Sequence, residues 1–383
     1  MSNAPKKIWL SPPHMGGEEQ GFVQEAFASN WVAPLGPNVD AFEQMLRETT
    51  HTKAAAALTS GTAALHLALR VLGIKEGDVV VCQSMTFAAS AFPITYEKAE
   101  PVFIDSEPDT WNMDPHLLKE ALTQLKKNGK NIAAIIVVHL YGMPAKMNEL
   151  LAVANEFGIP VIEDAAEALG SMYLNEPCGS MGSLAILSFN GNKIITTSGG
   201  GALIGNDVAL VDKARFLSTQ AKEPFPHYEH QVIGFNYRMS NIVAGIGRGQ
   251  MMVLPARVAK RRAIYDFYVK NLSSLPGLKF LPEPEGFFSN RWLTTIVVDP
   301  EISGGVHREQ IRIKLEEEHI ESRPLWKPMH LQPVFSQALS FLNGVSEELF
   351  HKGLCLPSGT AMTEEDLQRI CSLIKGCWTL NGN

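Results

Sequence analysis

One lysine stands where a reactive amine would be useful. Lys193 lies in the run SFNGNKIITTSGGG, shortly after an apolar stretch, LAILSF, that ends at Phe189. A strand ending there would deliver the amine into a loop of small polar residues. An amine held in this way can form a Schiff base with a carbonyl cofactor. Most lysines are solvated surface charges, so the interpretation depends on what lies upstream.

The upstream partner is Asp164, which ends the apolar run IPVIED and is followed by small residues. Ligands of open α/β sheets lie beyond the carboxyl ends of the strands. Pyridoxal 5′-phosphate (PLP) needs a Schiff-base lysine and an Asp or Arg at its pyridine nitrogen. An aspartate at this position is equally suited to capping a helix. Taken with Lys193, however, Asp164 indicates a PLP site.

The phosphate of such a cofactor needs a seat, and the turn from Thr59 to Gly61 is a candidate. It lies between a small-residue strand and an apolar helix in AAAALTSGTAALHLALRVLG. The start of a helix offers free N–H groups and the positive end of its dipole, so it attracts anions. Many α/β proteins contain a similar turn without binding phosphate.

The elements that would position these residues alternate along the first half of the chain. Alternating strands and helices predict a mostly parallel sheet covered on both faces. We expect a large domain over 1–250 and a smaller C-terminal α+β domain over 251–383. The expected strands are AAAALT, DVVVC, PVFID, IAAIIVVHL, PVIED, LAILSF and GGALIG, with helices near 62–72, 86–96, 115–127, 146–157 and 207–219. Beyond Ser240 we expect a long helix to about Leu272, divided near Pro255, then the strand RWLTTIVVD and helices near 307–319 and 363–379.

Four motifs together resemble a known family. SGTAALHLAL, IEDAAEALGS, SFNGNKIITTSGGG and GFNYRMSNI occur in the order typical of the DegT/DnrJ/EryC1/StrS sugar aminotransferases. The resemblance implies a fold-type-I, aspartate aminotransferase-like enzyme that uses PLP to aminate nucleotide-linked ketosugars. The runs LSPPHMGG, RPLWKPMH and LCLPSGTAM look most like the branch that aminates C4 of a UDP-linked 4-keto-6-deoxy-N-acetylhexosamine in bacillosamine-type pathways.

The resemblance also assigns roles at the cofactor. Lys193 matches the Schiff-base lysine that also moves the proton, and Asp164 matches the carboxylate at the ring nitrogen. Thr62, Ala63 and Ser188 match the residues that hold the phosphate, and Phe87 matches an aromatic residue against the ring. Glu167 matches a position near the phenolic oxygen, and Asn236 matches a residue that crosses a dimer interface. Many members have Gln where this chain has Glu167, and a carboxylate beside a phenolate repels it unless one of the two is protonated.

Substrate-binding candidates lie in the smaller domain and in loops. Arg323 follows a helix and precedes Pro324, so its guanidinium could hold a diphosphate or a donor carboxylate bidentately. Trp326 could stack on a uracil or sugar ring. The other candidates are His330 in the same segment, Tyr237 and Arg238 near the expected phosphate, and His139 at a strand end.

The expected reaction transfers an amino group from L-glutamate to the sugar ketone, in a homodimer whose active sites are shared between two chains. Two rival functions remain open. One is a PLP-dependent lyase or dehydratase on the same fold, and the other is a regulatory sensor that uses the fold without turnover.

Composition excludes several other classes of protein. The net charge is −7 without a basic cluster, which argues against nucleic-acid binding. No 18-residue apolar run or signal-like N-terminus occurs, so we expect no membrane insertion. The five cysteines lack CxxC spacing and are expected to be reduced thiols in a cytoplasmic protein. His227 and His230 are expected to bind no metal, because no further ligands accompany them.

Overall fold

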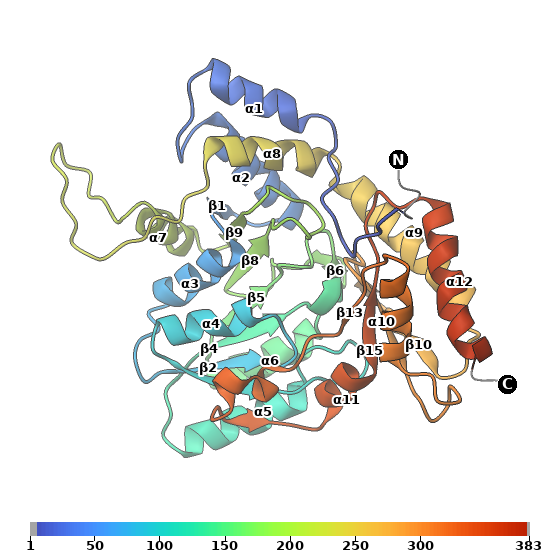
Figure 1. Ribbon diagram of the computed structural model, residues 1–383. Coiled ribbons are helices and arrows are strands. Elements are labelled where there is room, and N and C mark those ends of the chain that lie inside the picture. The colour runs from blue at the N-terminus through green and yellow to red at the C-terminus, as the bar shows by residue number, and fades with distance from the viewer. Residues whose placement is uncertain (1–5, 381–383) are drawn as a thin grey trace.

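A large, mostly parallel sheet forms the centre of the protein. The computed structural model describes residues 6–380 (Figure 1). The strand order is β1-β9-β8-β5-β4-β2-β3-β14, and β9 runs antiparallel to both of its neighbours. The strands are β1 (Ala54–Leu58), β2 (Val79–Gln83), β3 (Glu100–Ile104), β4 (Ile132–Val138), β5 (Val161–Asp164), β8 (Leu184–Ser188), β9 (Gly201–Gly205) and β14 (Ser340–Phe341). The seven strands expected from the sequence are confirmed, and β14 is an eighth.

Helices cover both faces of this sheet because its strands are apolar on both sides. In β1, Ala54 and Ala56 pack into one core with α3, whereas Ala55 and Ala57 pack into another with α2. The alternation follows from the two-residue period of a strand. The helices of the first half are α3 (Gly61–Val71), α4 (Ala88–Tyr96), α5 (Pro115–Lys127), α6 (Met147–Phe157) and α7 (Val208–Ser218), and a 3₁₀ turn, η1 (Leu140–Gly142), follows β4.

Three helices pack closely beside this sheet, at the top of Figure 1. They are α1 (Glu19–Ala28), α2 (Pro37–Thr50) and α8 (Asn241–Met252), of which the sequence predicted only α8. Their separation is set by glycine, since a Cβ on Gly247 would lie 2.8 Å from the ring of Phe42. The cost of glycine in a helix is therefore offset by the close approach of α2 to α8.

A second, antiparallel sheet organises the C-terminal part of the chain. Its order is β10-β12-β15-β13, and α9, α10 and α12 pack around it. The long helix predicted beyond Ser240 is divided at Val253, next to Pro255, as expected. The elements are α9 (Leu254–Leu272), β10 (Leu278–Phe280), β12 (Thr294–Val298), α10 (Arg308–Glu317), β13 (Arg323–Pro324), η2 (Met329–Leu331), η3 (Pro333–Phe335), α11 (Val345–Lys352), β15 (Gly353–Leu356) and α12 (Glu364–Leu380); a third sheet joins β11 (Phe287–Phe288), β6 (Met172–Tyr173) and β7 (Glu176–Pro177).

Two segments pair with elements that lie on the other side of residue 250 in the chain. Near the N-terminus, Ile8 forms a bridge with Ile320 beside the small sheet. In the other direction, β14 pairs with β3 and extends the large sheet. Each part is thus completed by a segment from the other, and residues from both reach the space between them. Within residues 6–380, no helix is long and apolar enough to cross a membrane. All five cysteines are buried and unpaired, which agrees with the expected thiols.

Candidate active site

A cavity of about 960 Å³ opens where the two parts of the chain meet. Its walls come from the carboxyl ends of β5 and β8, the first turns of α3 and α4, β13 and the segment 9–13. This is the edge of a parallel sheet at which ligands bind. The cavity brings together Lys193, Asp164, Thr62, Ser188, Glu167, Phe87, Arg323 and Trp326 from the residues predicted by the sequence.

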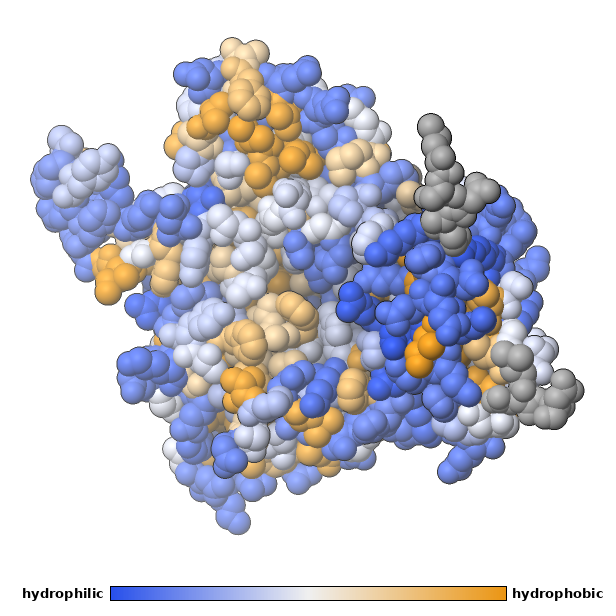
Figure 2. All heavy atoms as spheres, in the orientation of Figure 1, coloured by the Kyte–Doolittle hydropathy of each residue, from blue (hydrophilic) through white to orange (hydrophobic). Residues whose placement is uncertain are grey.

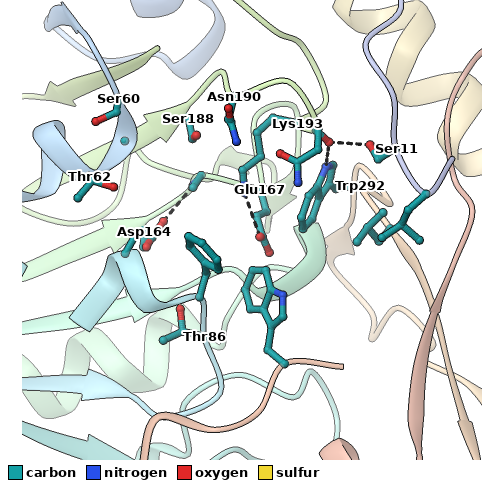
Figure 3. A pocket seen from close by; sticks show the side chains of 18 of the residues that line it. Ser11, Ser60, Thr62, Thr86, Asp164, Glu167, Ser188, Asn190, Lys193 and Trp292 are labelled. Carbon is teal, nitrogen blue, oxygen red and sulfur yellow. Dashed lines mark hydrogen bonds and ion pairs between the residues drawn. The ribbon is translucent and has the colours of Figure 1, made fainter. Parts of the chain in front are cut away.

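Lys193 lies in the loop after β8, and its amine points into the cavity (Figure 3). The Nζ atom lies 3.1 Å from Oε1 of Glu167 and 4.3 Å from the centroid of the Trp292 ring. Only 11% of the lysine side chain is exposed, so it is not an ordinary surface charge. The amine is therefore held in one place and remains open to the cavity.

Glu167 is the ionisable partner of this lysine. Its side chain is buried, and Oε2 accepts a hydrogen bond of 2.8 Å from the backbone N–H of Tyr141. Burial raises the pKa of Glu167 from 4.5 to about 7, while the charge of Lys193 acts in the opposite direction. A carboxyl group with this pKa can hold or release a proton near neutral pH.

Asp164 is fixed by hydroxyl groups at the end of β5. Ser90 Oγ donates to Asp164 Oδ2 over 2.6 Å, and the Thr86 hydroxyl lies 2.6 Å from that of Ser90. The backbone N–H of Ala166 donates to Oδ1 over 3.1 Å. The carboxylate is thus oriented by the start of α4 and still lines the cavity.

The first turn of α3 supplies an anion site. Ser60 caps the helix, and its Oγ accepts a 3.0 Å hydrogen bond from the backbone N–H of Ala63. Ser60, Gly61, Thr62 and Ser188 line the cavity. The structure does not place Ala63 there, because its N–H is already used by the cap. The free end of the helix therefore faces the cavity through the residues before Ala63.

Aromatic side chains form the wall opposite this turn. Phe87 is 57% exposed, and its ring centroid lies 5.6 Å from that of Trp326. The Trp326 ring lies 5.2 Å from that of Tyr141, whose hydroxyl accepts a hydrogen bond from the backbone N–H of Trp326. A flat ring would find aromatic partners on this side of the cavity.

Two predicted histidines are structural in this fold. His139 is fully buried, with Nε2 2.9 Å from Glu163 Oε2, and Nδ1 accepts a hydrogen bond from the backbone of Ala145. Both ring nitrogens are thus used inside the core, so His139 does not reach the cavity. His330 Nδ1 lies 2.7 Å from the hydroxyl of Ser84, and its Nε2 lies 3.2 Å from Oε1 of Glu347. Neither histidine belongs to the cavity wall.

Tyr237 and Arg238 also lie outside the cavity wall. Arg238 is buried and donates to Glu43 Oε1 over 2.8 Å, which satisfies its charge within the fold. Tyr237 stacks on Phe235, with 5.0 Å between ring centroids. Neither residue lines the cavity, although Arg238 forms a bridge with Leu58 just before the phosphate turn.

Arg323 and Asn236 are accessible but differ in position. Arg323 lines the mouth of the cavity, and its side chain is 69% exposed beside Glu321 at 2.8 Å. Asn236 is exposed and forms a bridge with Thr219, where the loop that follows α7 begins and ends. This loop protrudes at the left of Figure 1. Asn236 does not line its own chain's cavity.

Sequence reasoning missed one wall of the cavity. Trp292 and the segment 9–13 line it beside Lys193, together with Asn190 and Glu321. In the sequence, Trp292 lies inside the expected strand RWLTTIVVD and looks like an ordinary core residue. Segment 9–13 precedes every predicted element, and the run LSPPHMGG indicated only a branch of the family. Their place beside Lys193 depends on how distant parts of the chain meet.

The model of the DegT/DnrJ/EryC1/StrS aminotransferase family matches residues 13–375. The chain belongs to this family. Its cofactor is therefore PLP, and its fold is that of fold-type-I enzymes, as predicted. The site fits this cofactor, since one cavity presents an amine, a fixed carboxylate and the free end of a helix.

Individual relatives agree with this assignment. The chain is 55% identical over 373 residues to EpsN of Bacillus subtilis (strain 168), whose name gives it as a candidate PLP-dependent aminotransferase, with 96% of this chain and 95% of EpsN covered. It is 36% identical to the GDP-perosamine synthase of Escherichia coli O157:H7, with 96% and 98% covered. The PLP form of Spr1654 from Streptococcus pneumoniae, titled as a candidate sugar aminotransferase, superposes with a TM-score of 0.89 at 27% identity, covering 99% of this chain and all of the other.

Proposed function

We propose that this sugar aminotransferase transfers the amino group of L-glutamate to C4 of a nucleotide-linked 4-keto-6-deoxy sugar. The proposed acceptor is UDP-2-acetamido-2,6-dideoxy-4-hexulose, and the product is the UDP-linked 4-amino-4,6-dideoxy-N-acetylhexosamine. The observation that carries the proposal is the Lys193 amine, held 3.1 Å from Glu167 in the cavity that Asp164 also lines.

The residues of this chain then have distinct roles. When bound, PLP supplies a carbonyl carbon for the amines and a ring that withdraws electrons. Lys193 Nζ would anchor the cofactor and take up the proton released from the substrate carbon, and Glu167 Oε1 beside it would share that proton. Asp164 would hold the ring nitrogen, while Ser60, Thr62 and Ser188 would hold the phosphate.

The cavity is suited to a large, anionic substrate. Its volume of about 960 Å³ lies at the upper end of the usual range for small-molecule sites. Arg323 at its mouth is 69% exposed and would exchange its ion pair with Glu321, at 2.8 Å, for a diphosphate or a carboxylate. Trp326 would cover one face of a base or sugar. The name of the Escherichia coli relative specifies a GDP-linked product, so the nucleotide must be tested directly.

A second copy of the chain would complete each active site in a homodimer. Figure 2 shows apolar side chains gathered over α1, and Phe27, Trp31, Val32 and Leu35 are each more than 40% exposed there. An exposed apolar patch of this kind marks an interaction site. In the proposed dimer, Asn236 reaches the phosphate of the neighbouring site, so each site is built from two chains. Leu35→Glu should shift the protein from dimer to monomer in analytical ultracentrifugation, and a monomeric parent protein would refute the proposal.

The proposed reaction is tested one half at a time. The purified protein is incubated with glutamate, freed of donor, and mixed with UDP-2-acetamido-2,6-dideoxy-4-hexulose. We expect glutamate to remove the absorbance of the PLP form and the sugar to restore it, with the amino sugar detected by mass. If only the GDP- or dTDP-linked ketosugar restores it, the acceptor is wrong and the aminotransferase activity stands. If glutamate has no effect, the donor is wrong, and a lyase or sensor function gains support.

A further inference from the structure

The amine of Lys193 lies close to two groups, the carboxylate of Glu167 and the indole of Trp292 (Figure 3). Glu167 Oε1 lies 3.1 Å from Nζ, and the Trp292 ring centroid lies 4.3 Å from it. The negative face of an indole attracts an ammonium group, as the carboxylate does. We propose that Trp292 is a positioning residue, which together with Glu167 forms a seat for the Lys193 amine whenever that amine is not linked to the cofactor.

Trp292 is fixed in the orientation that this seat requires. Its Nε1 donates to the backbone carbonyl of Asn192 over 2.7 Å, directly beside Lys193. Its own backbone N–H donates to Asn290 Oδ1 over 2.8 Å. The ring stacks against Tyr141, with 6.3 Å between centroids and 16° between planes. The indole therefore cannot turn away from the lysine without breaking these contacts.

Ser11 of the N-terminal segment and the buried Arg261 hold Asn192 and Trp292 in this arrangement. Ser11 Oγ donates to the carbonyl of Asn192 over 2.6 Å, and Arg261 donates to Ser11 Oγ over 2.8 Å. The other guanidinium nitrogen of Arg261 donates to the carbonyl of Trp292 over 2.7 Å. Arg261 is only 2% exposed, and a cation buried against neutral oxygens is costly. Its position is explained if it holds Ser11 and Trp292, the two residues that donate to the carbonyl of Asn192.

The seat has a consequence for cofactor binding that can be measured. A Schiff base with PLP would use up the free ammonium group that the seat holds, so we expect the seat to stabilise the unlinked state. A cation–π contact contributes about 0.5 to 2 kcal/mol, which corresponds to a factor of roughly 2 to 30. Loss of Trp292 should therefore favour the linked state by that factor. The inference rests on the PLP dependence of the family and not on the proposed sugar or donor.

The experiment compares the binding of two cofactor forms to full-length protein from which the bound cofactor has first been removed. PLP can link to Lys193, whereas pyridoxamine 5′-phosphate carries an amine instead of the carbonyl and cannot. The dissociation constant of each is measured for the parent protein and for Trp292→Leu. We expect the ratio of the two constants to shift roughly 2- to 30-fold in favour of PLP. Contacts of the indole with the cofactor ring affect both forms and cancel in the ratio.

Three further variants make the result specific. Trp378→Phe removes a similar bond, from its Nε1 to the carbonyl of Pro276 at 3.1 Å, away from the cavity, and should leave the ratio unchanged. In a Lys193→Ala background, Trp292→Leu should also have no effect on the ratio. Trp292→Phe keeps an aromatic face with a weaker quadrupole, so it should give a smaller shift in the same direction, and it decides the question if Trp292→Leu does not fold. An unchanged ratio in the folded Trp292 variants, or a shift against PLP, would overturn the proposal.

Discussion

The raised pKa of Glu167 predicts how the stability of the cofactor-free protein depends on pH. The pKa is about 7 in the folded protein and 4.5 without burial. The folded state therefore binds a proton more tightly than the unfolded state between these values. By linkage, the free energy of unfolding falls as the pH rises through this window. At 1.36 kcal/mol for each pKa unit, the whole effect is about 3 kcal/mol.

Replacing Glu167 with Gln should remove this dependence. The amide has nearly the same shape and does not titrate, so the difference between the parent and variant proteins isolates one carboxyl group. The amide keeps one acceptor oxygen for the two donors that Glu167 serves, the N–H of Tyr141 and Lys193 Nζ. The lost hydrogen bond adds an offset that does not change with pH. Relative to Glu167→Gln, the parent protein should lose about 3 kcal/mol of unfolding free energy between pH 4.5 and pH 7.5.

The measurement is denaturant unfolding of cofactor-free protein at half-unit pH intervals. Glu283→Gln is the matched control, because Glu283 pairs with Arg262 and its pKa is lowered. Stability from that group is lost only as the pH falls below its ordinary range, so the Glu283→Gln difference should be flat from pH 5.5 to pH 7.5. Parallel pH curves for the parent protein and Glu167→Gln would refute the reasoning.

Three other changes test the site and its support. Lys193→Ala should lower turnover by at least about 10⁴-fold, since one side chain is proposed as both nucleophile and base, and near-normal turnover would refute that role. Arg323→Ala should raise the KM for the nucleotide sugar or for glutamate by about 10-fold or more, because a charge-assisted contact is worth about 1.5 to 3 kcal/mol; unchanged KM values for both would exclude Arg323. Gly247→Ala places a Cβ 2.8 Å from the ring of Phe42 and should destabilise the protein by about 1 to 3 kcal/mol. As a control, Gly376→Ala adds a Cβ in open space in α12 and should stabilise the protein by up to about 1 kcal/mol. Equal melting temperatures for the Gly247→Ala and Gly376→Ala variants would contradict the packing argument.

Local patterns in the sequence were sufficient for most of the large sheet. Most of its strands are short apolar runs, and each is followed by a helix or turn, so their type and order could be predicted. The same patterns located Asp164, which ends β5, and Lys193, which lies in the loop after β8. Helices α1 and α2 were missed. Helix α2 does carry a local signal, because Pro37 stands in its first turn and the buried Val39, Phe42 and Leu46 recur at helical spacing. In helix α1 only Glu19 and Ala26 are buried, so its own pattern is weak.

The sequence also could not separate buried polar residues from those in the cavity. His139 lies at a strand end, as Asp164 does, yet its Nε2 lies 2.9 Å from Glu163 Oε2 inside the core. Arg238 lies beside the phosphate turn but forms an ion pair with Glu43 at 2.8 Å. A polar side chain at a strand end can form its hydrogen bonds either inside the core or towards the cavity. Which of the two it does depends on a partner that is distant in the chain.

By itself, then, the sequence determined the sheet, the amine, the carboxylate and the anion-binding turn, because each follows from residues that are neighbours in the chain. The tertiary structure alone decided what surrounds the amine. Trp292 meets Asn192 across 100 residues, and Ser11 meets it across 181. Contacts over such separations form only when the N-terminal segment and the C-terminal part pack against the large sheet, so no local pattern encodes them.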